Sequence, residues 1–168
     1  MFDTPVEPVV VEQKGRLYLP HVLAVRANQT LQLGNDDPTS HNIDPVPANN
    51  REWNKAEPPG SKVEEGFARE AIAIPIPVNC NVHPWMRGYI AVFKHPFFAA
   101  TGKDGGFDLS NLPPGNYTIR AWHKKLGTST QTVTLGPNES KEIHFVGQEM
   151  ELKLRAEALV LLGAQTRC

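Results

Sequence analysis

The stretch that most constrains this chain is residues 80–86, where Cys80, His83 and Met86 follow one another at Cys-x2-His-x2-Met spacing. Neither a strand nor a helix brings three side chains at this spacing to one point. A tight loop does, and Pro84 favours a loop over a helix interior. A thiolate, an imidazole and a thioether together favour copper over other metals. The loop therefore predicts a metal site that lacks one of the usual four ligands.

A second histidine, His41, is the candidate for the fourth ligand. It follows an Asn-Asp-Asp-Pro turn within residues 34–59, a stretch rich in Asn, Asp and Pro with little periodicity. We expect this stretch to be a long loop, and long ordered loops are usually functional. Two histidines, a cysteine and a weak axial methionine are the ligands of blue-copper electron-transfer sites. Zinc is the main rival metal for the same four residues, but a thioether is a poor zinc ligand.

The composition is that of a globular, turn-rich protein. The 168 residues suffice for one medium domain or two small ones. Hydrophobic residues make up 40% and charged residues 21%, which excludes a disordered chain. The 13 glycines and 15 prolines favour many short strands over long helices. The formal net charge of -1 shows no excess of basic residues, which argues against nucleic acid as a partner.

Two cysteines, Cys80 and Cys168, are too few for a disulfide framework. If Cys80 binds metal, the chain cannot form an intramolecular disulfide. No apolar run reaches the roughly 18 residues of a membrane span, so we expect no transmembrane segment. Residues 1–8 have neither the basic flank nor the apolar core of a signal peptide.

Short runs of apolar, aromatic and β-branched residues between turns predict an all-β fold. The expected strands are residues 9–12, 16–19, 22–25, 30–33, 71–78, 88–93, 107–109, 117–122, 130–135 and 142–146. Residues 150–162 consist largely of strong helix formers and predict a short helix, with a frayed tail as the alternative. We therefore divide the chain into residues 1–95, residues 96–147 and a helical tail, residues 148–168.

Three segments resemble the cupredoxin family: residues 18–25 (YLPHVLAV), 35–43 (NDDPTSHNI) and 80–86 (CNVHPWM). The short ligand loop is most similar to that of the amicyanin group within this family. The resemblance covers residues 8–94. It implies a Greek-key β-sandwich that holds one copper ion, cycling between Cu(I) and Cu(II), near one end.

The resemblance also implies a ligand set, which is His41, Cys80, His83 and the axial Met86. It implies that the backbone amide of Asn42 donates to the Cys80 sulfur, while the Asn42 side chain ties the two ligand loops together. The same resemblance implies a periplasmic or otherwise exported protein with redox proteins as electron donor and acceptor. Because this ligand set leaves no strong open position for a substrate, we do not expect an enzyme.

A later part of the chain, GGFDL at residues 105–109 and LPPGNYTI at residues 112–119, is similar to carboxypeptidase-regulatory-like, transthyretin-like β modules. The resemblance implies that residues 96–147 form a second small β-sandwich-like module. His95 and His123 could form a second metal site. Two histidines alone supply too few ligands for such a site, which favours a structural role for both.

The leading functional prediction is one-electron transfer through a type 1 copper site. The first alternative is a module that binds or delivers copper without transferring electrons. The second is a structural, partner-docking subunit of a larger redox complex. Trp85 bears on the first prediction because, with Pro84, it would form an apolar rim around His83 and suit transient redox encounters. Inward packing of Trp85 is the alternative.

Overall fold

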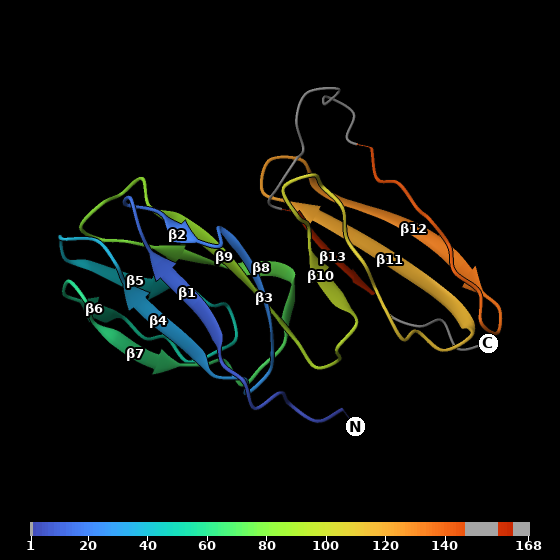
Figure 1. Ribbon diagram of the computed structural model, residues 1–168, viewed down its shortest axis with the longest axis horizontal. Helices are drawn as coiled ribbons and strands as arrows, with labels where there is room; N and C mark the ends of the chain where they lie inside the picture. The colour runs from blue at the N-terminus through green and yellow to red at the C-terminus, as the bar shows by residue number, and fades with distance from the viewer. Residues whose placement is uncertain (1, 147–157, 163–168) are drawn as a thin grey trace. The chain divides into compact units, whose positions relative to one another are not determined.

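The computed structural model describes residues 2–146 and the backbone of residues 158–162. It divides the chain into two compact units, Met1–Pro96 and Phe97–Cys168. Every regular element among the described residues is a strand (Figure 1), which confirms the predicted all-β class. Over the same residues, the structure contains no helix of the length and apolarity that a membrane crossing requires.

Residues 2–96 form nine strands. Their bounds are β1 (Val9–Gln13), β2 (Tyr18–Leu19), β3 (Val22–Arg26), β4 (Leu31–Asn35), β5 (His41–Pro45), β6 (Lys55–Glu57), β7 (Lys62–Glu65), β8 (Ala71–Asn79) and β9 (Arg87–Phe93).

These strands build two sheets, with the orders β2-β1-β4-β7 and β3-β9-β8-β5-β6. β1 pairs with β4 in parallel and β4 with β7 in antiparallel, while the other sheet pairs β3 with β9 in parallel. Consecutive strands such as β3, β4 and β5 therefore alternate between sheets, which gives a β-sandwich with Greek-key connections. Figure 1 shows the two sheets stacked face to face.

The core of the first unit lies between these sheets. Leu31 and Leu33 on β4 are fully buried while Gln32 between them is partly exposed, as the predicted alternation requires. Ile76 on β8 and Ile90 on β9 join the same cluster from the other sheet. Because burying each such side chain stabilises the fold by about 1.5–3 kcal/mol, this cluster fixes the strands that carry the candidate ligands.

The prediction of one long loop over residues 34–59 was wrong, because this stretch contains β5 and β6. β5 (His-Asn-Ile-Asp-Pro) contains a single β-branched residue, Ile43, and does not alternate, since four of its five residues are buried. It is a strand because it pairs with β6 on one edge and β8 on the other. Tertiary pairing thus outweighs the weak local propensity of its Asn, Asp and Pro residues.

The second unit contains a sheet in the order β10-β13-β11-β12, formed by β10 (Phe98–Ala100), β11 (Gly115–His123), β12 (Gly127–Leu135) and β13 (Ala158–Leu162). The predicted strands at 107–109 and 142–146 were wrong, since neither takes part in a sheet of the described chain. Their apolar side chains nevertheless join the small core of this unit, where the rings of Phe107 and Phe145 lie 6.3 Å apart.

The helix predicted over residues 150–162 was wrong for the part that the structure describes. Residues 158–162 form β13, which pairs with both β10 and β11. An apolar run of this length is compatible with a helix or with a buried strand, and pairing on both edges decides for the strand. The rest of the predicted helical tail, residues 148–157 and 163–168, lies outside the described residues.

Candidate metal centre

The loop between β8 and β9 carries Cys80 and His83. Cys80 is buried at 3% exposure, and His83 is half-buried. The backbone N–H of His83 donates to the Cys80 Sγ over 3.4 Å, and the N–H of Met86 donates to the His83 carbonyl over 2.9 Å. These two bonds fold the loop back on itself, so that residues three apart in the sequence present their side chains to one point.

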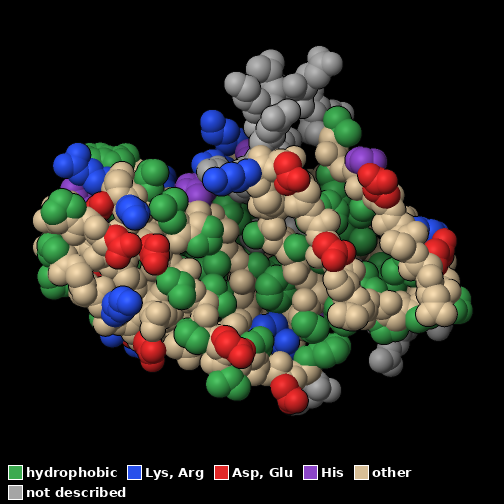
Figure 2. Space-filling view, viewed as in Figure 1, with side chains coloured by type: hydrophobic (Ala, Val, Ile, Leu, Met, Phe, Trp, Pro, Cys, Tyr) green, Lys and Arg blue, Asp and Glu red, His purple; other side chains and the backbone are tan. Residues whose placement is uncertain are grey.

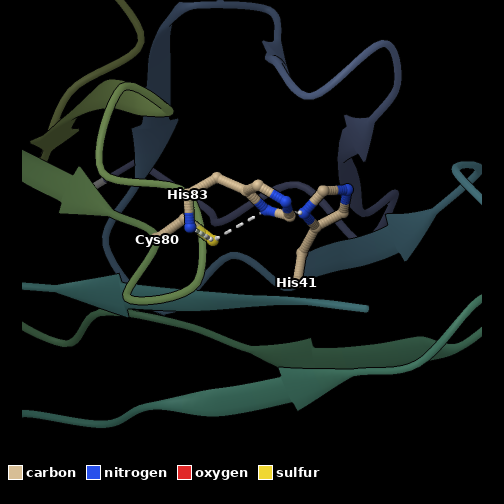
Figure 3. A group of neighbouring side chains, drawn as sticks. All are labelled: His41, Cys80 and His83. Carbon is tan, nitrogen blue, oxygen red and sulfur yellow. Dashed lines mark hydrogen bonds between the residues drawn. The ribbon is translucent and has the colours of Figure 1, made fainter. Parts of the chain in front are cut away.

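His41, the first residue of β5, meets this loop. Its Nδ1 lies 2.9 Å from the Nδ1 of His83, and the Cys80 Sγ lies 3.9 Å from that same nitrogen of His83. The ligand atoms of the three residues all lie within 4.8 Å of one another. Figure 3 shows the three side chains pointing toward one another, with His41 approaching from β5 and the other two from the loop between β8 and β9. The structure thus brings together three of the four predicted ligands.

The 2.9 Å between the two Nδ1 atoms and the 3.9 Å between the Cys80 Sγ and the His83 Nδ1 fit a metal ion. Nitrogen and sulfur ligands bind such ions at about 2.0–2.3 Å, so two ligands of one ion lie within about 4 Å of each other. Two imidazoles and a thiolate suit copper, for which imidazole favours Cu(II) and thiolate favours Cu(I). Burial lowers the pKa of His83, and the neighbouring His41 adds to this effect. A neutral imidazole is the form that binds a metal.

Met86, the predicted axial ligand, is fully buried and belongs to the same core cluster as Cys80. Its role as a ligand stays a prediction.

His95 lies in the first unit and His123 in the second. His95 packs against Phe93, and the Nδ1 of His123 accepts a bond from the N–H of Lys125. A metal site built from these two histidines also stays a prediction.

Asn42 ties the two ligand-bearing segments together, as the resemblance implied. Its Oδ1 accepts a hydrogen bond of 2.7 Å from the backbone N–H of Asn81, directly after Cys80. Its Nδ2 donates to the side chains of Asn54 and Asn81 over 2.9 and 3.2 Å. The bond that the Cys80 Sγ accepts in the described chain comes from His83. The one expected from the Asn42 amide stays a prediction.

Two further residues support the site without having been singled out from the sequence. The Tyr18 hydroxyl lies 2.5 Å from the Asn42 carbonyl and 2.9 Å from the Asn79 carbonyl, and so bridges the two ligand-bearing strands. Burial raises the pKa of Tyr18, and the nearby Cys80 raises it further. Asp37 contacts His41 itself, with its Oδ2 2.8 Å from the His41 Nε2. The only sequence signal for Asp37 was its place in the turn before His41.

The pKa of Asp37 is lowered although burial alone would raise it. The backbone N–H of Arg16 donates to this carboxylate and contributes most to the lowering, followed by the contact with His41. Asp37 is therefore ionised at neutral pH. The site combines a buried carboxylate, two imidazoles and a thiol, which is a set of groups able to hold a soft or borderline cation.

No protein-family model and no curated protein matches this sequence. Among solved structures, a copper-containing nitrite reductase from Thermus scotoductus SA-01 is similar with a TM-score of 0.48 and 20% identity, over 53% of this chain and 23% of that one. A purple cupredoxin from Nitrosopumilus maritimus gives 0.43 and 23%, over 50% of this chain and 98% of that one.

A mutant amicyanin in its reduced state is similar with a TM-score of 0.45 and 22% identity, over 51% of this chain and 81% of that one. The chain thus spans less than a quarter of the nitrite reductase but most of the two small proteins. At such scores and identities the likeness carries nothing about ligands or partners. The metal centre is argued from this chain's own residues.

Proposed function

We propose that this protein is a one-electron carrier whose type 1 copper site is formed by His41, Cys80, His83 and Met86. The observation that carries the proposal is the convergence of two imidazoles and one thiol within 4.8 Å, on segments far apart in the sequence. Copper bound there would supply a one-electron Cu(I)/Cu(II) couple.

The protein would hold the ligands still. Cys80 and His83 lie on a loop closed by its own hydrogen bonds, and His41 starts a strand paired on both edges. Asn42 and Tyr18 link these segments. A rigid ligand set keeps structural change between two oxidation states small, which suits electron transfer. With Met86 as the fourth ligand no strong open position remains, so we propose a carrier rather than an enzyme.

His83 and Trp85 would provide the contact with redox partners. Trp85 is 63% exposed, so the alternative of inward packing does not apply. Its ring lies 5.2 Å from that of His83, edge to face, and the neighbouring Val82 is also exposed. A small apolar surface beside one ligand suits weak, transient encounters with a protein electron donor and acceptor. Acidic and basic side chains are interspersed on the face that Figure 2 shows.

We further propose a periplasmic or otherwise exported location, in line with the predicted resemblance. The copper-delivery alternative differs in its redox behaviour, because a delivery protein would bind Cu(I) without fast electron exchange. The docking-subunit alternative would retain its partner when metal-free. Both alternatives lack a specific contact in the described residues that favours them over the carrier.

The test is the optical spectrum of metal-free protein titrated with Cu(II). We expect an intense visible band from the thiolate–copper pair, at one equivalent, that disappears on reduction. Cys80→Ser abolishes the band, whereas the matched control Cys168→Ser keeps it. A wild-type protein without the band, or a Cys80→Ser variant that retains it, overturns the proposal.

A further inference from the structure

Asp37 lies between a backbone turn and the candidate ligand His41. Its Oδ1 accepts a hydrogen bond of 2.7 Å from the N–H of Gly15, and its Oδ2 accepts one of 2.7 Å from the N–H of Arg16. The same Oδ2 lies 2.8 Å from the Nε2 of His41. The side chains of His41 and Asp37 are only 0% and 9% exposed, so water does not compete with these contacts.

The turn that holds Asp37 has an unusual backbone. Gly15 and Arg16 both have positive φ angles, 63° and 58°. In this turn the successive N–H groups of Gly15 and Arg16 both donate to one carboxylate, as in the anion-binding concavities that backbone turns form. Glycine adopts such a conformation without steric cost, but Arg16 does not. The Asn35 Oδ1 accepts a bond of 2.9 Å from the backbone N–H of Asp37 and so fixes the backbone of this residue.

Because both oxygens of Asp37 accept bonds from amide donors, the group facing His41 is an acceptor. In the neutral imidazole of His41, Nε2 then carries the proton that joins the two side chains and Nδ1 carries the lone pair. This Nδ1 is the nitrogen that faces His83. An imidazole whose remote nitrogen donates to a carboxylate is also a stronger metal ligand.

We propose that Asp37 is a positioning residue, whose carboxylate holds His41 in the tautomer protonated at Nε2 and so presents the bare Nδ1 to the metal. This inference deepens the proposed function and rests on it for the identity of the metal. The tautomer itself is a property of the metal-free protein. In that state the bare Nδ1 of His41 accepts a hydrogen bond from the Nδ1 of His83, 2.9 Å away.

The experiment is nitrogen-15 NMR of the imidazole rings in metal-free protein, followed by Cu(I) and Cu(II) binding and redox titration. The variants are Asp37→Asn and Asp37→Ala, with Asp36→Asn as the matched control. Asp36 is the neighbouring, exposed carboxylate and undergoes the same charge change. In the wild type and the control, we expect His41 to be protonated at Nε2 and bare at Nδ1.

In Asp37→Ala we expect exchange between the two His41 tautomers and roughly 10- to 100-fold weaker copper binding. Asp37→Asn keeps part of the turn's hydrogen bonding but loses the charge, and we expect a higher reduction potential because His41 becomes a weaker donor. A wild-type His41 protonated at Nδ1, or Asp37 variants that match the control in tautomer, affinity and potential, overturns the inference. If the tautomer is as stated but copper gives no band, the proposed copper function fails and the positioning role stands.

Discussion

At the residue scale, one set of buried polar side chains of the first unit gathers around the candidate metal centre. The set comprises Gln13, Asn35, Asp37, His41, Asn42 and Glu57. Burying a polar group is costly unless hydrogen bonds compensate for the lost water. Most of these groups are so compensated, and their bonds connect β1, β4, β5 and β6. Polar burial here specifies one arrangement of the strands rather than adding bulk stability.

Glu57, whose burial is incompletely compensated, gives a pH prediction. It is fully buried opposite His41, its Oε2 accepts a bond of 2.8 Å from Gln13, and its Oε1 has no partner in the described chain. Burial raises its pKa from an ordinary 4.5 to about 7. The folded state therefore binds more protons than the unfolded state between these values. The stability that Glu57 contributes is complete below pH 4.5 and is lost as the pH rises through about 7.

We expect the metal-free wild type to lose on the order of 3 kcal/mol of unfolding free energy, relative to Glu57→Gln, between about pH 4.5 and about pH 8. Urea unfolding at several pH values measures this difference. Glu64→Gln, at an exposed position on the neighbouring β7, should follow the wild type. A Glu57→Gln variant with the same pH dependence as the wild type contradicts the prediction.

At the element scale, the junction between β5 and the 80–86 loop depends on Asn42. Asn42→Ala removes the acceptor of the Asn81 N–H and the donor to Asn54. Because the partner amide is left partly buried without a bond, we expect a loss of about 1–3 kcal/mol in unfolding free energy. Denaturant unfolding of metal-free protein measures it.

The matched control is Asn81→Ala, which keeps the backbone N–H that Asn42 accepts and loses only the side-chain contact of 3.2 Å. We expect this variant to lose clearly less stability than Asn42→Ala. Equal losses of unfolding free energy in the two variants would contradict the prediction. They would mean that the contact between the two side chains, and not the backbone hydrogen bond to Asn42, links the strand to the loop.

The elements that the sequence predicted best are those whose side chains alternate, such as β4, and those flanking the ligand loop, β8 and β9. The ligand loop itself was predictable because its three residues are close in sequence. β5 was missed because its Asn, Asp and Pro residues have little strand propensity, and its pairing partners lie far along the chain. Asp37 and Tyr18 were missed for a similar reason: their contacts with the site depend on tertiary folding, which no local spacing encodes.

At the scale of the whole molecule, the chain consists of two units with separate sets of buried side chains. The first unit holds every candidate ligand and a core cluster drawn from both of its sheets. The second has a sheet with a small core around Tyr117 and Ile119. The assignment of this second unit to a regulatory-like module and the three-part division of the chain stay predictions.

This division predicts that a fragment ending at Pro96 folds and binds copper by itself. A unit of this size can bury enough apolar surface to be stable alone, and its two sheets enclose their core between them. Within the unit, the Arg26 guanidinium donates to the carbonyls of Phe2, Asp3 and Lys94, which secures both ends of the fragment. We expect cooperative urea unfolding and the same copper-dependent visible band, at the same position and intensity, as in the full chain.

The matched control is the fragment carrying Cys80→Ser, which should fold to the same extent but show no band. Circular dichroism checks folding independently of the metal. A fragment that fails to unfold cooperatively contradicts the prediction, because it would mean that the first unit depends on residues after Pro96 for its stability. A folded fragment with an altered band would instead mean that later residues shape the metal centre, which the ligand contacts within the first unit do not require.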